Sequence, residues 1–357
     1  MFHDLFFSKS KGKAPKPCPI ALSTRVRLAR NLREFPFPGR AQSGQKKAVL
    51  SKCMKALEKV KNLKACTSVE LDELSELDRQ ILVERHLISL ELSQSDESGG
   101  VVLSDDRSCS VMVNEEDHLR IQVLSNGLDF QKVWALADSL DSGIESKLDY
   151  AFDSQLGFLT ACPTNLGTGM RASVMMHLPG LVMSKNMDKV INAVNHLGIA
   201  VRGLFGEGSD ASGSIFQISN QQTLGESETA ILERLQVTLD NIVQQESMAR
   251  EKLMEDDGLR LVDKISRAAG SLKNCFLIQS SEAMDHLSLI RLAADFGLLP
   301  EKFRAIADRM FIEVQPGHVQ LSAGKPIEPG ERDRLRAETL RKEFIRMPHL
   351  NLDTQVD

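Results

Sequence analysis

The chain has 357 residues, of which 42% are hydrophobic and 26% charged, so it can bury a core and is not expected to be disordered as a whole. Its 44 Lys and Arg residues are outnumbered by 49 Asp and Glu residues, and a net charge of −5 argues against a general nucleic-acid binder. No apolar run approaches a membrane span, and six scattered cysteines without a C-x-x-C pair argue against a disulfide framework, so we expect a soluble, cytoplasmic protein.

The first part of the chain predicts a flexible segment, then helices, then short strands. Residues 1–19 contain several Lys and Pro and have no apolar core of a secretory signal, so we expect a flexible lead-in. Apolar residues at helical spacing predict helices over about 45–61 and from Leu71 to Leu82. Runs rich in β-branched residues then predict strands at Val101–Leu103, Cys109–Val113 and Leu119–Leu124.

The rest of the chain mixes the two patterns and then becomes helical. Helices are predicted over about 129–142 and 168–197, and strands at Gly157–Ala161, Ile199–Phe205 and Ser214–Ser219. Residues 226–257 lack Gly and Pro and carry apolar residues at helical spacing, which predicts a long amphipathic helix. Further helices are expected up to about residue 346, with breaks at Gly258, Gly270, Gly297–Pro300, Pro316–Gly317 and Pro329–Gly330.

Two stretches combine charge with strand spacing. In Ser23-Thr24-Arg25-Val26-Arg27 the two arginines are two residues apart, so an extended segment would point both guanidinium groups to one face. Such a pair suits a polyphosphate, although a solvated basic strand is an alternative. In Asn114-Glu115-Glu116-Asp117-His118-Leu119-Arg120, three acids lie on a predicted hairpin connection. This is either a solvated turn or a carboxylate group that faces a cationic substrate.

Two further stretches contain glycine loops. Cys162-Pro163-Thr164-Asn165-Leu166-Gly167-Thr168-Gly169 follows a predicted strand and precedes a predicted helix that carries Arg171, so backbone N–H groups at the helix start could form an anion site. It lacks the G-K-[ST] of a Walker loop. Arg202-Gly203-Leu204-Phe205-Gly206-Glu207 begins a second glycine loop, which predicts close backbone approach to a ligand.

Together, S-T-R-V-R, N-E-E-D-H-L-R, C-P-T-N-L-G-T-G-x-R-A-S and R-G-x-x-G-E resemble the phosphagen (guanidino) kinases closely, over roughly residues 20–250. The similarity is nearest to the bacterial protein-arginine kinases (McsB type). About 22 residues precede S-T-R-V-R, Phe205 and Met175 replace an arginine and a histidine of the small-molecule enzymes, and R-D-x-x-R-A occurs at Arg332 to Ala337. The resemblance implies an α+β fold, with a catalytic domain of an antiparallel sheet flanked by helices at 20–250 and a helical domain at 251–357 for phosphoarginine binding and dimerisation.

The resemblance also implies the site. The catalytic residues would be Glu116 as base, Glu115, Glu207 and Cys162, and the phosphoarginine-binding residues Arg332, Asp333 and Arg336. ATP, with Mg²⁺ held mainly by phosphates and water rather than by protein ligands, would contact Ser23, Thr24, Arg25, Val26, Arg27, His86, Arg120, Arg171, Ala172, Ser173, Val174, Met175, Arg202, Gly203, Leu204, Phe205 and Gly206.

The expected activity is ATP-dependent phosphorylation of arginine side chains in proteins, in quality control and stress response. A kinase of free arginine or another small guanidino compound is one alternative, and a non-catalytic phosphoarginine-binding adaptor is another. By resemblance the partners would be protein substrates with exposed arginine, a zinc-finger activator, a heat-shock repressor and a Clp protease that degrades the products, with a homodimer and allosteric control. Neither direct nucleic-acid binding nor a membrane is expected.

Overall fold

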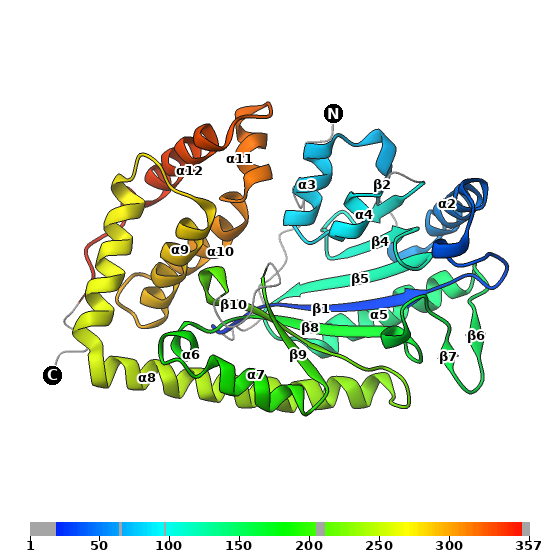
Figure 1. The fold of residues 1–357 in the computed structure, drawn as a ribbon, viewed down its shortest axis with the longest axis horizontal. Coiled ribbons are helices and arrows are strands. Elements are labelled where there is room, and N and C mark those ends of the chain that lie inside the picture. Colours follow the sequence, from blue (N-terminus) through cyan, green and yellow to red (C-terminus); the bar gives the residue numbers. More distant parts are fainter. Residues whose placement is uncertain (1–18, 64–65, 96–97, 205–210, 352–357) are drawn as a thin grey trace. The chain divides into compact units, whose positions relative to one another are not determined.

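The computed structural model describes residues 19–63, 66–95, 98–204 and 211–351. Most of the strands form one sheet with the order β2-β3-β4-β5-β1-β8-β10-β9, and β6 pairs with β7 (Figure 1). The strands are β1 Ala21–Arg30, β2 Thr67–Glu70, β3 Gly100–Leu103, β4 Cys109–Val113, β5 Leu119–Asn126, β6 Phe152–Asp153, β7 Gly157–Phe158, β8 Met170–His177, β9 Ile199–Gly203 and β10 Ile215–Asn220.

Helices flank this sheet and make up most of the C-terminal part. They are α2 Ser43–Leu57, α3 Glu76–Glu84, α4 Leu90–Ser93, α5 Phe130–Glu145, α6 Pro179–Met183, α7 Met187–Asn195, α8 Glu228–Asn274, α9 Ser280–Asp295, α10 Lys302–Glu313, α11 Pro316–Ala323 and α12 Pro329–Phe344. No helix among the described residues combines the length and apolar character that crossing a membrane requires.

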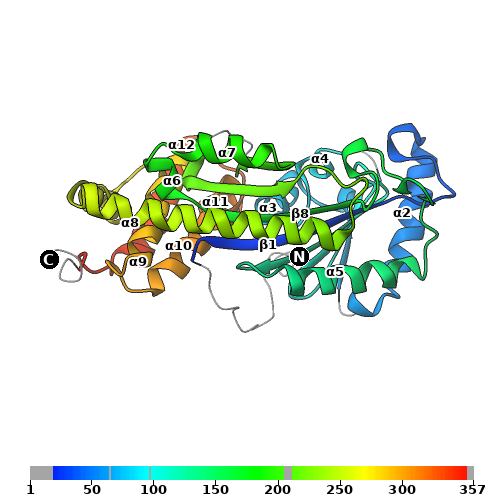
Figure 2. The same ribbon diagram turned by 90° about the horizontal axis from the view of Figure 1, so that it is seen from below.

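The chain divides into two compact units. The first contains Met1–Val174, Gly198–Ala200 and Ile218–Thr238, and the second contains Met175–Leu197, Val201–Gln217 and Leu239–Asp357. In the first unit α5 packs against β1 and β5 and follows β1 along the sheet (Figure 2), while α2 packs against β3 and β4. In the second unit α9 and α10 pack together, and α11 packs against α12. The predicted boundary between residues 250 and 251 stays a prediction.

Most predicted elements are present, and the predicted hairpin is confirmed. β4 and β5 pair antiparallel, with Cys109 opposite Val123 and Val113 opposite Leu119. The helix predicted from Leu71 to Leu82 is shorter, because Ser75 caps α3 by accepting a hydrogen bond from the Asp78 N–H. The predicted strand Gly157–Ala161 is limited to Gly157–Phe158.

Two predictions from the middle and the end of the chain are wrong. Residues 170–177 form strand β8 rather than the start of a helix. Met and Ala favour helices, but this segment lies between β1 and β10 in the sheet, and tertiary pairing overrides so weak a preference. The break predicted at Gly258 is confirmed, because α8 contains a kink with non-helical geometry at the preceding residue, Asp257. The break predicted at Gly270 is wrong, because the helix continues through it to Asn274. A single glycine costs a helix only about 1 kcal/mol, which packing can offset.

Candidate active site

Strand β1 presents its arginines on one face, as the sequence predicts. Alternation places Arg25 and Arg27 on the same side of the strand as Ser23, and the β1–β5 register sets Arg27 opposite Gln122. Thr24 and Val26 are fully buried on the other face. The Thr24 hydroxyl donates to the Gly127 carbonyl at 2.6 Å, so the structure does not bring Thr24 and Val26 to the arginine face.

The neighbouring strands add two more guanidinium groups to this face. On β5 Arg120 pairs with Ala29 of β1, and on β8 Arg171 donates to the Ser219 hydroxyl at 3.2 Å. Arg25 donates to Ser173 of β8 at 3.4 Å. Arg171 therefore lies on a strand. The prediction that it belongs to an anion site at the start of a helix is wrong. A cavity of about 80 Å³ opens among these strands, lined by Arg27, Leu28, Ala29, Glu116, Arg120, Cys162, Thr164, Asn165, Gly169 and Arg171.

The arginines destabilise one another's charges. Burial, assisted by the charges of Arg120 and Arg171, lowers the pKa of Arg25 to about 10. Burial also lowers the pKa of Arg27 well below its usual value, assisted by the charge of Arg25. Within the described part of the chain, the buried Arg27 Nε has no hydrogen-bond partner. Several crowded cations and an unused donor fit a polyanion, which supplies both countercharge and acceptors.

His86 lies beside this cationic cluster. Burial, together with the charges of Arg25 and Arg27, lowers its pKa to about 4, so the imidazole is neutral at physiological pH. Its backbone has φ of 58°, and its carbonyl accepts a hydrogen bond from Gln122 Nε2 at 2.7 Å. Gln122 therefore links His86 to the strand that carries Arg120.

The two glutamates of the acidic turn, Glu115 and Glu116, have different surroundings. Glu115 has a side chain only 1% exposed and pairs with Arg120 at 2.6 Å, while Ser89 donates to it at 2.7 Å. Glu116 is 42% exposed and lines the cavity. Burial raises the pKa of Glu116, whereas Arg120 and a hydrogen bond from the Cys162 thiol lower it. Glu115 thus holds Arg120, and Glu116 is left facing the cavity beside Cys162.

Asn31 and Asp117 connect the acidic turn to the Cys162 segment. The Asp117 carboxylate accepts hydrogen bonds from Asn31 Nδ2 and from the Ala161 N–H, both at 2.6 Å. The Asn31 Oδ1 accepts from the His118 N–H at 2.9 Å. Sequence reasoning missed Asn31. Its place directly after S-T-R-V-R-L-A-R, just beyond the end of β1, is the one signal that could have indicated it.

The remaining residues that are predicted to contact ATP lie in different parts of the structure. On β8, Ala172 and Val174 are fully buried, and the Ala172 N–H donates to Asn220 Oδ1 at 2.8 Å. Their contact with ATP stays a prediction. Met175, Arg202, Gly203 and Leu204 belong to the second compact unit, where Arg202 is exposed at the end of β9. Phe205, Gly206 and Glu207 lie outside the described residues.

Comparisons with known proteins match both parts of the chain. A family model for the C-terminal catalytic domain of ATP:guanido phosphotransferases matches residues 48–249, and one for the C-terminal domain of protein-arginine kinase McsB matches residues 258–355. A protein-arginine kinase of Brevibacillus brevis is 42% identical over 334 residues, which cover 93% of each chain. One of Moorella thermoacetica is 43% identical and covers 93% of this chain and 95% of its own. The chain belongs to the protein-arginine kinase family.

Solved structures support the fold expected of a protein-arginine kinase. A duplicated taurocyamine kinase of Schistosoma mansoni, bound to components of a transition-state analogue, superposes with a TM-score of 0.60 and 26% identity. The match covers 69% of this chain and 36% of that chain. A lombricine kinase matches 69% of this chain and 75% of its own, with a TM-score of 0.55 and 21% identity. The predicted α+β fold and the resemblance to phosphagen kinases are confirmed.

The R-D-x-x-R-A motif, which runs from Arg332 to Ala337 and indicates the protein-arginine kinase branch, lies on α12. Arg336 is 2% exposed and donates to the carbonyls of Val314 at 2.6 Å and Ile278 at 2.8 Å. It also pairs with Asp333 at 2.6 Å. Arg332 is half-buried one turn earlier. Arg336 therefore holds α12 and Asp333 in place, and Arg332 and Asp333 remain the accessible members of the motif.

Proposed function

We propose that this protein-arginine kinase transfers the γ-phosphoryl group of ATP to the guanidinium group of arginine side chains in proteins. One observation carries the proposal. A single cavity is lined both by Arg27, Arg120 and Arg171 and by Glu116 and Cys162. The first set suits phosphates, and the second suits a guanidinium cation.

On the phosphate side, the arginines would bind the β- and γ-phosphates and stabilise the charge of the transferring group. Phosphoryl transfer depends mainly on positioning and charge stabilisation, so crowded guanidinium groups, among them Arg27 with its unused Nε donor, are suited to it. We propose Mg²⁺ as the companion of ATP. ATP oxygens and water would hold most of its coordination positions, as Mg²⁺ prefers. The ion would neutralise phosphate charge.

On the acceptor side, the difficulty is that arginine is protonated at neutral pH and is a poor nucleophile. Glu116 would accept the proton from the attacking nitrogen as the N–P bond forms and the bond from the γ-phosphorus to the ADP oxygen breaks. Cys162 would contact the same cation. Glu207 stays a prediction as a second carboxylate on the guanidinium.

On α12, we propose that Arg332 and Asp333 bind phosphoarginine, Arg332 at the phosphate and Asp333 at the guanidinium group. Arg336 would orient Asp333 through their 2.6 Å ion pair. We further propose a cytoplasmic homodimer under allosteric control. Its partners in protein degradation and stress response would be a zinc-finger activator, a heat-shock repressor and a Clp protease. These assignments rest on the family resemblance.

The test is incubation of the purified chain with radiolabelled Mg-ATP and an unfolded arginine-containing protein. We expect acid-labile phosphate on arginine, and its loss with Glu116→Ala. Transfer to free L-arginine but not to protein would instead identify a small-molecule guanidino kinase. Phosphoarginine binding without any transfer would identify a non-catalytic adaptor.

A further inference from the structure

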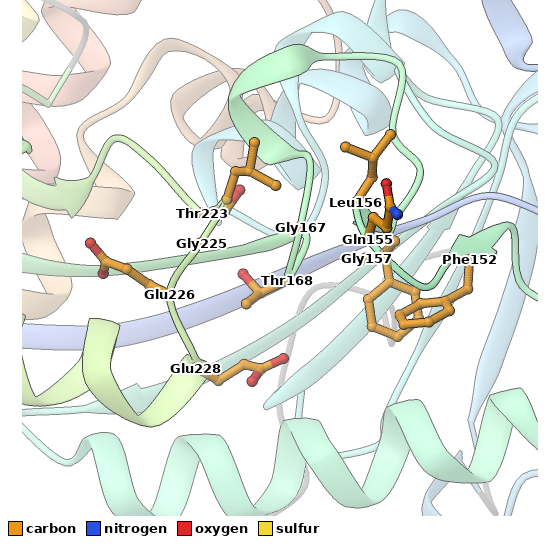
Figure 3. Close-up of a pocket in the computed structure, with 12 residues that line it drawn as sticks. Phe152, Gln155, Leu156, Gly157, Gly167, Thr168, Thr223, Gly225, Glu226 and Glu228 are labelled. Atoms are coloured by element: carbon orange, nitrogen blue, oxygen red, sulfur yellow. The ribbon is translucent and has the colours of Figure 1, made fainter.

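The two faces of the sheet carry different cavities. A cavity of about 250 Å³ is lined by the β6–β7 hairpin, by Gly167 and Thr168 and by the segment before α8 (Figure 3). Arg30 packs on this side, with its guanidinium carbon 3.5 Å from the centre of the Phe158 ring and a hydrogen bond to the Thr168 carbonyl at 2.9 Å. Arg27, three positions earlier on β1, points to the opposite face. Residues that support the phosphate-binding arginines therefore lie on that opposite face.

Gln122 lies on the face of the cationic cluster, in the middle of β5. It comes two residues after Arg120, and the strand register sets it opposite Arg27 of β1 and Ser110 of β4. Its side chain is buried, and its amide Nε2 donates to the His86 carbonyl at 2.7 Å and to the Ser110 hydroxyl at 3.1 Å. One amide group therefore joins β4, β5 and the loop that follows α3.

His86 occupies a backbone position that glycine usually takes. The Leu87 N–H donates to the Leu82 carbonyl at 2.9 Å. The His86 N–H donates to the Val83 carbonyl at 2.8 Å, and the two bonds together are the Schellman ending of helix α3. His86 is the left-handed residue of this motif, with φ of 58°. A histidine in place of glycine indicates that its side chain has a use that offsets the strain.

The imidazole of His86 is available to a ligand. Among the described residues, the hydrogen bonds of His86 use its backbone N–H and carbonyl, and none uses the ring. The ring lies close enough to Arg25 and Arg27 for their charges to lower its pKa, and it is neutral at physiological pH. A neutral ring can donate one hydrogen bond and accept another without adding a cation to the cluster.

The loop from His86 to Ser89 is tied to the site at both ends. Gln122 holds its first residue, and the hydroxyl of its last residue, Ser89, donates to Glu115 at 2.7 Å. Removing the Gln122 donor would leave a carbonyl at a helix end without its partner, while the Ser89 contact would remain. Such a change should therefore move the imidazole rather than the whole loop.

We propose that Gln122 is a positioning residue for ATP binding, because its hydrogen bond to the His86 carbonyl holds the imidazole where it contacts the nucleotide. The inference rests on the proposed function, since it assumes that ATP binds at the cationic cluster and touches His86. An amide suits this task because it donates without charge. A lysine would add a further cation beside Arg27, and an ionised glutamate would have no donor.

The test replaces Gln122 by methionine, which has a similar length and no donor. We expect the Kd for ATP, measured by calorimetry, to rise about fivefold, as for the loss of one hydrogen bond, and the KM for ATP to rise with it. The kcat at saturating ATP and the KM for an unfolded protein substrate should stay near their wild-type values. Gln122→Val, whose branched side chain favours a strand, is a second variant without a donor.

Ser110→Ala is the matched control, because it removes the other acceptor of the same amide and keeps the contact with His86. We expect its Kd for ATP to equal that of the wild-type chain. Thermal unfolding of each variant separates a change in ATP binding from a loss of folded protein.

The route through His86 is tested in a second background. His86→Gly removes the imidazole and suits the left-handed backbone, so we expect this variant to be at least as stable as the wild-type chain. Its Kd for ATP should rise by a factor of about five or more. Gln122→Met should cause no further loss in the His86→Gly chain, because two residues that act through one contact are not additive.

An unchanged Kd for ATP in the folded Gln122→Met and Gln122→Val chains would overturn the inference, and failure of both to fold would make Gln122 a structural residue instead. Full ATP affinity of His86→Gly, an equal loss in Ser110→Ala, or a further loss from Gln122→Met in the His86→Gly chain would overturn it as well. Absence of phosphate transfer by the wild-type chain would contradict the proposed function alone, because the Kd for ATP decides the role of Gln122.

Discussion

On β1 the guanidinium groups of Arg25 and Arg27 lie among other cations, whereas on α12 the guanidinium group of Arg336 is enclosed by acceptors. Arg27 lines a cavity and has a buried Nε without a hydrogen-bond partner in the described structure. Arg336 meets two backbone carbonyls and the Asp333 carboxylate. The two motifs look alike in sequence, since each repeats arginine at a spacing that puts the side chains on one face.

This difference in surroundings distinguishes arginines that are available to bind a ligand from arginines that stabilise the fold. A buried guanidinium group whose donors already meet carbonyls contributes to stability and has little capacity left for a ligand. A guanidinium group surrounded by like charges keeps its donors and gains when an anion arrives.

The largest effect is expected for Glu116→Gln, which removes the proposed base from the cationic cavity. We expect kcat to fall by a factor of about 10²–10⁴, because a positioned base contributes that much to proton transfer. ATP affinity should be retained, and thermal stability should not fall. Kinase assays, nucleotide titration and thermal unfolding measure the three quantities, and Glu91→Gln on the exposed surface of α4 is the matched control. Normal turnover would remove Glu116 from the mechanism.

The next largest effect is a difference in stability between variants of two arginines of α12, Arg332 and Arg336. Arg336→Met leaves buried carbonyls and Asp333 without their donor, so we expect the free energy of unfolding to fall by about 3–5 kcal/mol. Arg332→Met should leave stability nearly unchanged and weaken phosphoarginine binding. Denaturant unfolding and calorimetric titration with phosphoarginine compare the pair. If Arg336→Met were as stable as Arg332→Met, the structural assignment of Arg336 would be wrong.

A smaller effect is expected at Asn31, which donates a hydrogen bond to the Asp117 carboxylate. Asn31→Ala removes a donor from the buried Asp117, and we expect a loss of about 1–3 kcal/mol in the free energy of unfolding. Because Asp117 also holds the Ala161 N–H, the next residue, Cys162, should be alkylated faster by iodoacetamide. Ser154→Ala, at an exposed position outside this network, is the control. Unchanged alkylation would show that the Asn31–Asp117 contact does not position Cys162.

The smallest effect concerns pH. The pKa of Glu116 is raised, chiefly by burial, so the folded chain binds more protons than the unfolded chain between the ordinary and the raised value. Stability contributed by this group therefore falls as pH rises through that window. Glu116→Gln should be slightly more stable than the wild-type chain at neutral pH, and the difference should vanish below the ordinary pKa of Glu. An unfolding series over pH measures this, and a constant difference would contradict it.

Much of the fold and part of the site follow from local patterns. Alternation in β1 predicts the common face of Arg25 and Arg27, and the runs on either side of the acidic turn predict the β4–β5 hairpin. These predictions succeed because strand periodicity and hairpin connection are properties of neighbouring residues.

Other parts could not be predicted because they depend on distant residues. Arg171 lies on a strand because β8 pairs between β1 and β10, which no local pattern reveals. Glu115 and Glu116 are adjacent and chemically identical, yet one is buried against Arg120 and the other faces the cavity. The link from Asn31 through Asp117 to Ala161 joins three separate segments.

The sequence by itself determined the family, the α+β fold and the arginine and glutamate motifs, because those depend on residue types at fixed spacing. Only the tertiary structure decided which of these side chains face the cavity. Arg30, three residues after Arg27, shows the reason, since it points to the opposite face of β1 and pairs with Asp141 at 2.6 Å. The countercharge that each arginine meets is brought by another part of the chain, and that is a property of the folded molecule.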